Sequence, residues 1–105
     1  MLAQVTGVVM PGLPLHGHTA VAAAGTAVGI AASTALVSGI NIKALSANTG
    51  LIFVGNSTVE NASGAVAVRG YELNAKESVF LEVDDIGKVF VDAAVSGEGV
   101  SWLAS

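Results

Sequence analysis

The C-terminal part of the chain alternates between apolar and polar residues with the period of two that is typical of β-strands. Residues 77–103 read ESVFLEVDDIGKVFVDAAVSGEGVSWL. Val79, Leu81 and Val83 fall on one face of an extended segment, and the alternation resumes at Val89 after the turn sequence DDIG. The pattern predicts a meander of three antiparallel strands with one apolar face that is buried from solvent.

The length of the first turn sets the predicted register of this meander. A three-residue loop that ends at Gly87, with this glycine in the left-handed conformation, pairs Asp84 with Lys88 and Val83 with Val89. A slip by one residue would turn the apolar side chains to the opposite face. We therefore expect Gly87 to have a positive φ.

Short strands separated by turn residues also run through the middle of the chain. A five-residue loop at residues 46–50 places Ile42 opposite Val54, and a four-residue loop at residues 96–99 leads into the last strand. Further short strands are expected at residues 65–68 and 71–73. About seven or eight short strands of this kind predict an all-β fold, an antiparallel β-sandwich or barrel-like module.

Charged and aromatic residues are absent from the N-terminal part of the chain. The first charged side chain is Lys43, and the five aromatic residues lie between Phe53 and Trp102. We therefore expect residues 1–35 to form an uncharged, extended N-terminal arm that serves assembly. Residues 36–105 are expected to form the antiparallel β domain.

Three interpretations compete for the N-terminal part. A secretory signal peptide needs a basic first region, which MLAQVTG lacks. A transmembrane helix over Thr19–Val37 has a suitable length, but glycine and hydroxyl residues interrupt its few strongly apolar positions. We prefer extended structure, with a short hairpin of residues 19–23 and 26–30, that lies along a neighbouring subunit or a partner. A structureless tail is the alternative.

Composition narrows the classes of function. Charged residues make up 11% of the chain, the formal net charge is −4 and only four residues are basic. Nucleic-acid binding needs a basic footprint, so it is not expected. A monomer with so few charged groups would be poorly solvated, which favours a homo-oligomer or an assembled structure. The chain has no cysteine, which excludes a disulfide scaffold and a thiol nucleophile.

The candidate chemistry is sparse. His16-Gly17-His18 could contribute to a zinc site, but no acid or cysteine stands nearby. In the pair Asp84-Asp85, we interpret Asp85 as a turn residue and Asp84 as the partner of Lys88. The serines lack the G-x-S-x-G elbow of a hydrolase. We therefore expect no enzyme activity, no cofactor, no metal and no small-molecule substrate.

The second face of the meander mixes aromatic and charged residues. Phe80, Phe90 and Leu103 stand there among Glu82, Lys88 and Asp92. A second sheet of the same chain could cover this face, or it could be a subunit contact in which apolar anchors have a charged rim. The candidate assembly and partner-contact residues, taken from the arm and from this face, are Val5, Val8, Val9, Leu13, Val21, Val28, Phe80, Phe90 and Leu103.

Three runs of residues resemble a known family. They are IKALSANTGLIFVG, ESVFLEVDDIGKVFVDA and GEGVSWL. From Thr19 to Ser105 the chain resembles small tailed-phage virion proteins encoded among head-assembly genes, described as capsid decoration, cement or head-fibre proteins. The resemblance lies in the sequences of the strands and turns, and the family has no diagnostic site residue that could be assigned to a position of this chain.

The resemblance implies a structural role in the virion. Such proteins are β-rich modules, commonly homotrimers, that sit on the capsid exterior and bridge capsomers, with the major capsid protein as partner. The expected location is then the virion, and the host cytoplasm during assembly. The alternative function is a tail- or fibre-associated adhesion module that binds a host surface glycan, although the loops lack exposed aromatic platforms. Membrane binding is not expected.

Overall fold

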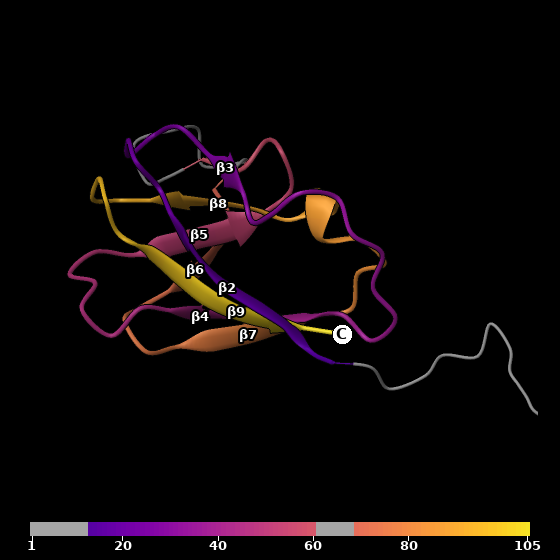
Figure 1. Ribbon diagram of the computed structural model, residues 1–105. Coiled ribbons are helices and arrows are strands. Elements are labelled where there is room, and N and C mark those ends of the chain that lie inside the picture. The colour runs from indigo at the N-terminus through magenta and orange to yellow at the C-terminus, as the bar shows by residue number, and fades with distance from the viewer. Residues whose placement is uncertain (1–12, 61–68) are drawn as a thin grey trace, which may run out of the picture.

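Eight strands form two stacked antiparallel sheets in the computed structural model, which describes residues 13–60 and 69–105 (Figure 1). Sheet 1 has the strand order β2-β9-β4-β7, and sheet 2 has the order β3-β8-β5-β6. The predicted all-β sandwich is confirmed, and it is not a closed barrel. The strands are β2 (Leu15–Ala20), β3 (Val28–Gly29), β4 (Ile40–Ala44), β5 (Ile52–Gly55), β6 (Tyr71–Leu73), β7 (Ser78–Leu81), β8 (Phe90–Ala93) and β9 (Gly99–Ala104).

Alternate residues of both sheets fill the space between them. Ile40 and Ile42 of β4 and Ile52 of β5 are fully buried in one core cluster. Successive side chains of a strand point to opposite faces, so Asn41 and Lys43 lie on the outer face of sheet 1. The alternation seen in the sequence thus does mark the buried face of these strands.

The predicted meander is wrong because the chain changes sheets at its turns. β7 pairs with β4 in sheet 1, β8 pairs with β5 and β3 in sheet 2, and β9 returns to sheet 1. Leu81 therefore lies opposite Ile40 and not opposite Val91. The expected pairing of Ile42 with Val54 is wrong for the same reason, because β4 and β5 belong to different sheets.

The connection from β7 to β8 crosses between the sheets and contains a short 3-10 helix, η2 (Ile86–Lys88). Ile86 is only 1% exposed and belongs to the core cluster. Among the described residues, the glycines with a positive φ are Gly25, Gly39 and Gly97, so the expected left-handed Gly87 is also wrong. A segment that carries a buried isoleucine across the sandwich does not need the tight reversal of a hairpin.

Much of the expected arm is part of the sandwich. β2 pairs with β9 along its whole length, and Val21 and Ile30 are buried in the core. The expected hairpin of residues 19–23 and 26–30 does not form, because β2 and β3 lie in different sheets. No helix among residues 13–60 and 69–105 is long and apolar enough to cross a membrane. The candidates Val5, Val8 and Val9 and the strand expected at residues 65–68 fall outside the described residues.

Candidate interaction surface

The register of sheet 1 aligns two rows of side chains on its outer face. In the first row, Phe80 of β7 lies opposite Asn41, which lies opposite Leu103, which in turn lies opposite His16. In the second row, the same strands contribute Ser78, Lys43, Ser101 and His18. These eight residues, contributed by all four strands of the sheet, are called the outer face of sheet 1 below.

Two large apolar side chains stand out from the outer face of sheet 1. Phe80 is 53% exposed and Leu103 is 54% exposed, with the polar Asn41 between them. A Cβ atom at Gly39 would lie 3.0 Å from Cζ of Phe80, so the absence of a side chain there leaves room for the ring. Exposed apolar side chains with polar neighbours are a composition found in contact surfaces.

The structure brings together only some of the sequence-based candidates. Phe80 and Leu103 share the outer face of sheet 1, as the interpretation of a common face expected. Phe90 is separated from them, because it lies half-buried in sheet 2 between Gly29 and Gly55. His16 and His18 join the surface although the sequence analysis did not connect them with it.

The arm candidates have different positions. Leu13 is 92% exposed at the start of the described chain. Val28 is partly buried and packs against the core cluster. Val21 is fully buried, so its side chain belongs to the core and offers no surface to a partner.

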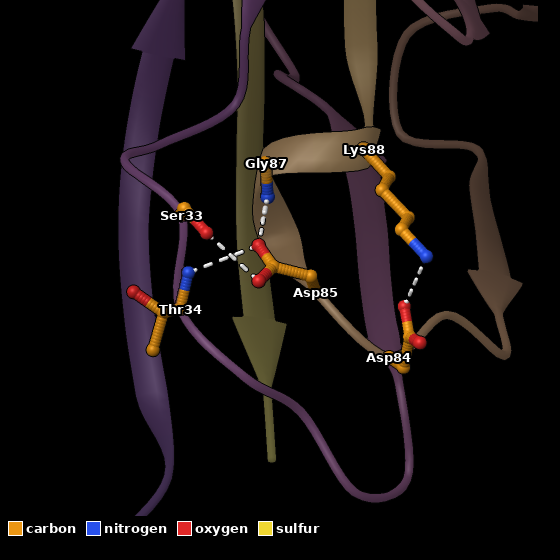
Figure 2. Close-up of polar contacts among 6 residues, drawn as sticks. All are labelled: Ser33, Thr34, Asp84, Asp85, Gly87 and Lys88. Atoms are coloured by element: carbon orange, nitrogen blue, oxygen red, sulfur yellow. Dashed lines mark hydrogen bonds and ion pairs between the residues drawn. The ribbon is translucent and has the colours of Figure 1, made fainter.

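Asp85 holds two loops together at the end of the sandwich (Figure 2). Its Oδ1 accepts hydrogen bonds from Gly87 N at 2.7 Å and from Thr34 N at 3.0 Å, and its Oδ2 accepts one from Ser33 Oγ at 2.8 Å. These bonds, first of all that from Gly87, hold the pKa of Asp85 below its ordinary value of 3.8. Asp85 thus has a local structural role, as expected, although it caps η2 and the hairpin turn in which it was expected does not form.

The expected pair of Asp84 and Lys88 is also confirmed, although it spans η2 and not a hairpin. Nζ of Lys88 lies 2.7 Å from Oδ1 of Asp84, with both side chains largely exposed (Figure 2). The hydrogen bond and the charge of Lys88 lower the pKa of Asp84, and those of Asp84 raise the pKa of Lys88. An exposed pair of this kind contributes little to stability.

Two other carboxylates hold backbone segments in place. Glu98 accepts hydrogen bonds from Thr49 N, Thr49 Oγ and Gly50 N at 2.7–2.9 Å, which lower its pKa. Asp92 is fully buried, and its Oδ1 accepts from Gly25 N at 3.0 Å and from Ala93 N at 2.8 Å. Both carboxylates thus receive backbone N–H groups from within the chain.

The candidate metal ligands of the sequence are not gathered into a metal site in the part of the chain that the structure describes. His16 and His18 are exposed on one face of β2, and no group of three His, Cys, Asp or Glu residues there could hold a metal ion. The carboxylates of Asp84 and Asp85 are engaged by Lys88 and by the loop at residues 33–34. The outer face of sheet 1 is the feature that remains to be explained.

The lowered pKa values predict a loss of stability in acid. A carboxylate with a folded pKa below its unfolded value stabilises the fold above the unfolded pKa, and this stabilisation disappears as the pH falls through the folded pKa. The ordinary values are 4.5 for Glu98 and 3.8 for Asp85. We expect urea unfolding to give a constant stability above about pH 5 and a decline below about pH 4.5. Glu98→Gln should make this decline shallower, and an unchanged slope would contradict the role of Glu98.

Comparisons with known proteins identify no relative. No protein-family model matches the chain, and neither the curated proteins nor the solved structures give a match. The outer face of sheet 1 and the resemblance of the sequence to head-decoration proteins are therefore the two features that bear on function.

Proposed function

We propose that this chain is a structural virion protein, a decoration or cement protein that binds the outside of a phage head and bridges its capsomers. The observation that carries the proposal is the outer face of sheet 1, where Phe80 and Leu103 lie exposed in one row. The resemblance of the sequence to head-decoration proteins supplies the partner, the major capsid protein.

The geometry of this surface suits a contact that holds two protein surfaces together and involves no chemical reaction. Four strands present their outer side chains over one sheet, so both apolar groups can press on a partner at the same time. Large apolar side chains at the centre of a contact contribute most of the binding energy, while polar neighbours exclude water around them. A protein bound across two capsomers stabilises their association by mass action, because it binds the assembled shell and not the separated parts.

Co-sedimentation with empty phage heads tests this proposal. Phe80→Ser and Leu103→Ser should each weaken binding by about tenfold, which corresponds to about 1.4 kcal/mol. Tyr71→Ser is the matched control, because Tyr71 is 63% exposed but belongs to sheet 2. Circular dichroism should show that all three variants remain folded.

The possible outcomes distinguish an error in the proposed contact surface from an error in the proposed function. If the folded Phe80 and Leu103 variants bind as well as the unchanged protein, the contact lies elsewhere on the molecule. If the unchanged protein does not sediment with heads at all, the proposed function is wrong. Binding to host-surface glycans in place of heads would support the adhesion function instead.

A further inference from the structure

β2 is an edge strand of sheet 1 and has the composition of an unprotected edge. Within residues 13–60 and 69–105 it pairs only with β9 and is the outermost strand of sheet 1. Its six residues, LHGHTA, include no Lys, Arg, Asp, Glu or Pro. Edge strands usually carry such residues because unpaired backbone groups attract other strands.

The register shows which backbone groups of β2 face outward. Val21 N donates to the carbonyl oxygen of Glu98 at 2.9 Å, immediately after the strand. Hydrogen-bonded positions alternate along an antiparallel pair, so Thr19 and Gly17 also direct their N–H and C=O groups toward β9. The backbone groups of His16, His18 and Ala20 therefore point away from sheet 1.

The other three edges of the described sheets are less suited to pairing. β7 is flanked by Glu77 and Glu82, β6 contains Glu72, and β3 consists of only two residues. Like charges that meet across a new strand pair would oppose association at β7 and β6. β2 is the uncharged edge of useful length among them.

We propose that two copies of this chain associate by antiparallel pairing of their β2 strands. The outward groups are centred on His18, so a two-fold axis there places His18 opposite His18 of the second copy and His16 opposite Ala20. Two copies of an uncharged strand can pair without repulsion between like charges, which favours a second copy of this chain as the partner at this edge. Pairing would form roughly six backbone hydrogen bonds and one continuous sheet of eight strands.

This pairing also enlarges the outer face of sheet 1. A two-fold axis between antiparallel strands runs perpendicular to the sheet, so the outer faces of both copies point to the same side. The rows of Phe80 and Leu103 then lie on one surface twice as large. A two-fold contact closes at two copies, whereas the resemblance to decoration proteins implies three.

Site-directed cross-linking tests which edge is used. The chain has no cysteine, so a single introduced thiol reports only on its own position. His18 and Ser78 belong to the same row of the outer face but stand at opposite edges of sheet 1. With a short bismaleimide, His18→Cys should yield covalent dimers, and Ser78→Cys, the matched control, should remain monomeric on denaturing gels.

Sedimentation equilibrium measures the reversible contact. His18→Glu places like charges across the two-fold axis and should raise the dimer Kd at least tenfold. Ser101→Glu is the matched control, because Ser101 lies directly opposite His18 but on β9, inside the sheet. It adds the same charge to the same face and should change the Kd less than about twofold.

Three results would overturn the proposal. The first is a protein that stays monomeric at about 100 μM, a concentration at which even a weak contact would form dimers. The second is equal cross-linking of His18→Cys and Ser78→Cys. The third is the formation of mixed dimers when these two variants are combined. Mixed dimers would mean that β2 of one copy meets β7 of the next. These assays contain no phage heads, so a monomer that still binds heads would leave the proposed function intact.

Discussion

Gly39→Ala is expected to lower the free energy of unfolding by about 3 kcal/mol or more. Gly39 has a φ of 133°, a region that L-residues with a side chain rarely adopt. A Cβ atom there would also collide with the carbonyl oxygen of Leu81 and touch the ring of Phe80. Conformational strain and overlap with the backbone of β7 therefore add, and urea denaturation followed by circular dichroism measures their sum.

Gly97→Ala separates these two costs. Gly97 also has a positive φ, 87°, but a Cβ atom there would meet nothing within 4 Å. Only the conformational cost remains, so we expect a loss of about 1–2 kcal/mol. Equal losses for the two variants would mean that β7 moves to accommodate a side chain at Gly39.

Phe53→Ala is expected to destabilise the fold by about 3–5 kcal/mol. Phe53 is fully buried although it lies on the face of sheet 2 opposite the main core, in one row with Asp92 and Glu72. Gly25 N donates to Oδ1 of Asp92 there, and Phe53 and Asp92 are both fully buried, so this part of the second face of sheet 2 is also covered. Removal of the ring would leave a cavity in this second packing layer, which thermal unfolding would detect.

Phe80→Ala is the control for Phe53→Ala. The ring of Phe80 is about half exposed, so we expect its loss to cost the monomer less than about 1 kcal/mol. If Phe80→Ala is as destabilising as Phe53→Ala, the outer face of sheet 1 supports the fold, and its exposure would no longer argue for a partner.

The alternation in the sequence predicts the strands and their buried faces but not their partners. A turn that reverses the chain within one sheet and a turn that carries it to the opposite sheet both return the apolar residues to the same core. Val83 and Val89 therefore fit a hairpin pattern although β7 and β8 lie in different sheets. Ile86 was the available signal, because a large apolar residue in the middle of a supposed exposed turn indicates a buried crossing.

The interaction surface was predictable only where it depends on neighbouring positions in one strand. Phe80 and Leu103 were placed on one face, and the structure joins them through Asn41 of β4. A hairpin of β7 and β8 would place Phe90 on the same face, but β8 pairs with β3 and β5 in the other sheet. His16 was missed because it reaches the surface through the pairing of β2 with β9, and local sequence patterns carry no information on contacts between the two ends of a chain.

The pairing of β2 with β9 also determines when the protein can fold. Leu15 lies opposite Ala104, and Nε1 of Trp102 donates to Oγ1 of Thr19 at 3.2 Å. β9 stands between β2 and β4, so sheet 1 lacks its second strand until β9 has been synthesised. To form these contacts, the chain must bring together two strands that are separated by most of its length, at a cost in loop-closure entropy. Proteins with such a high contact order fold slowly, in about milliseconds to seconds. Until then the uncharged β2 lacks the strand with which it pairs in the structure, and a nascent chain is most exposed to association with other chains during that interval.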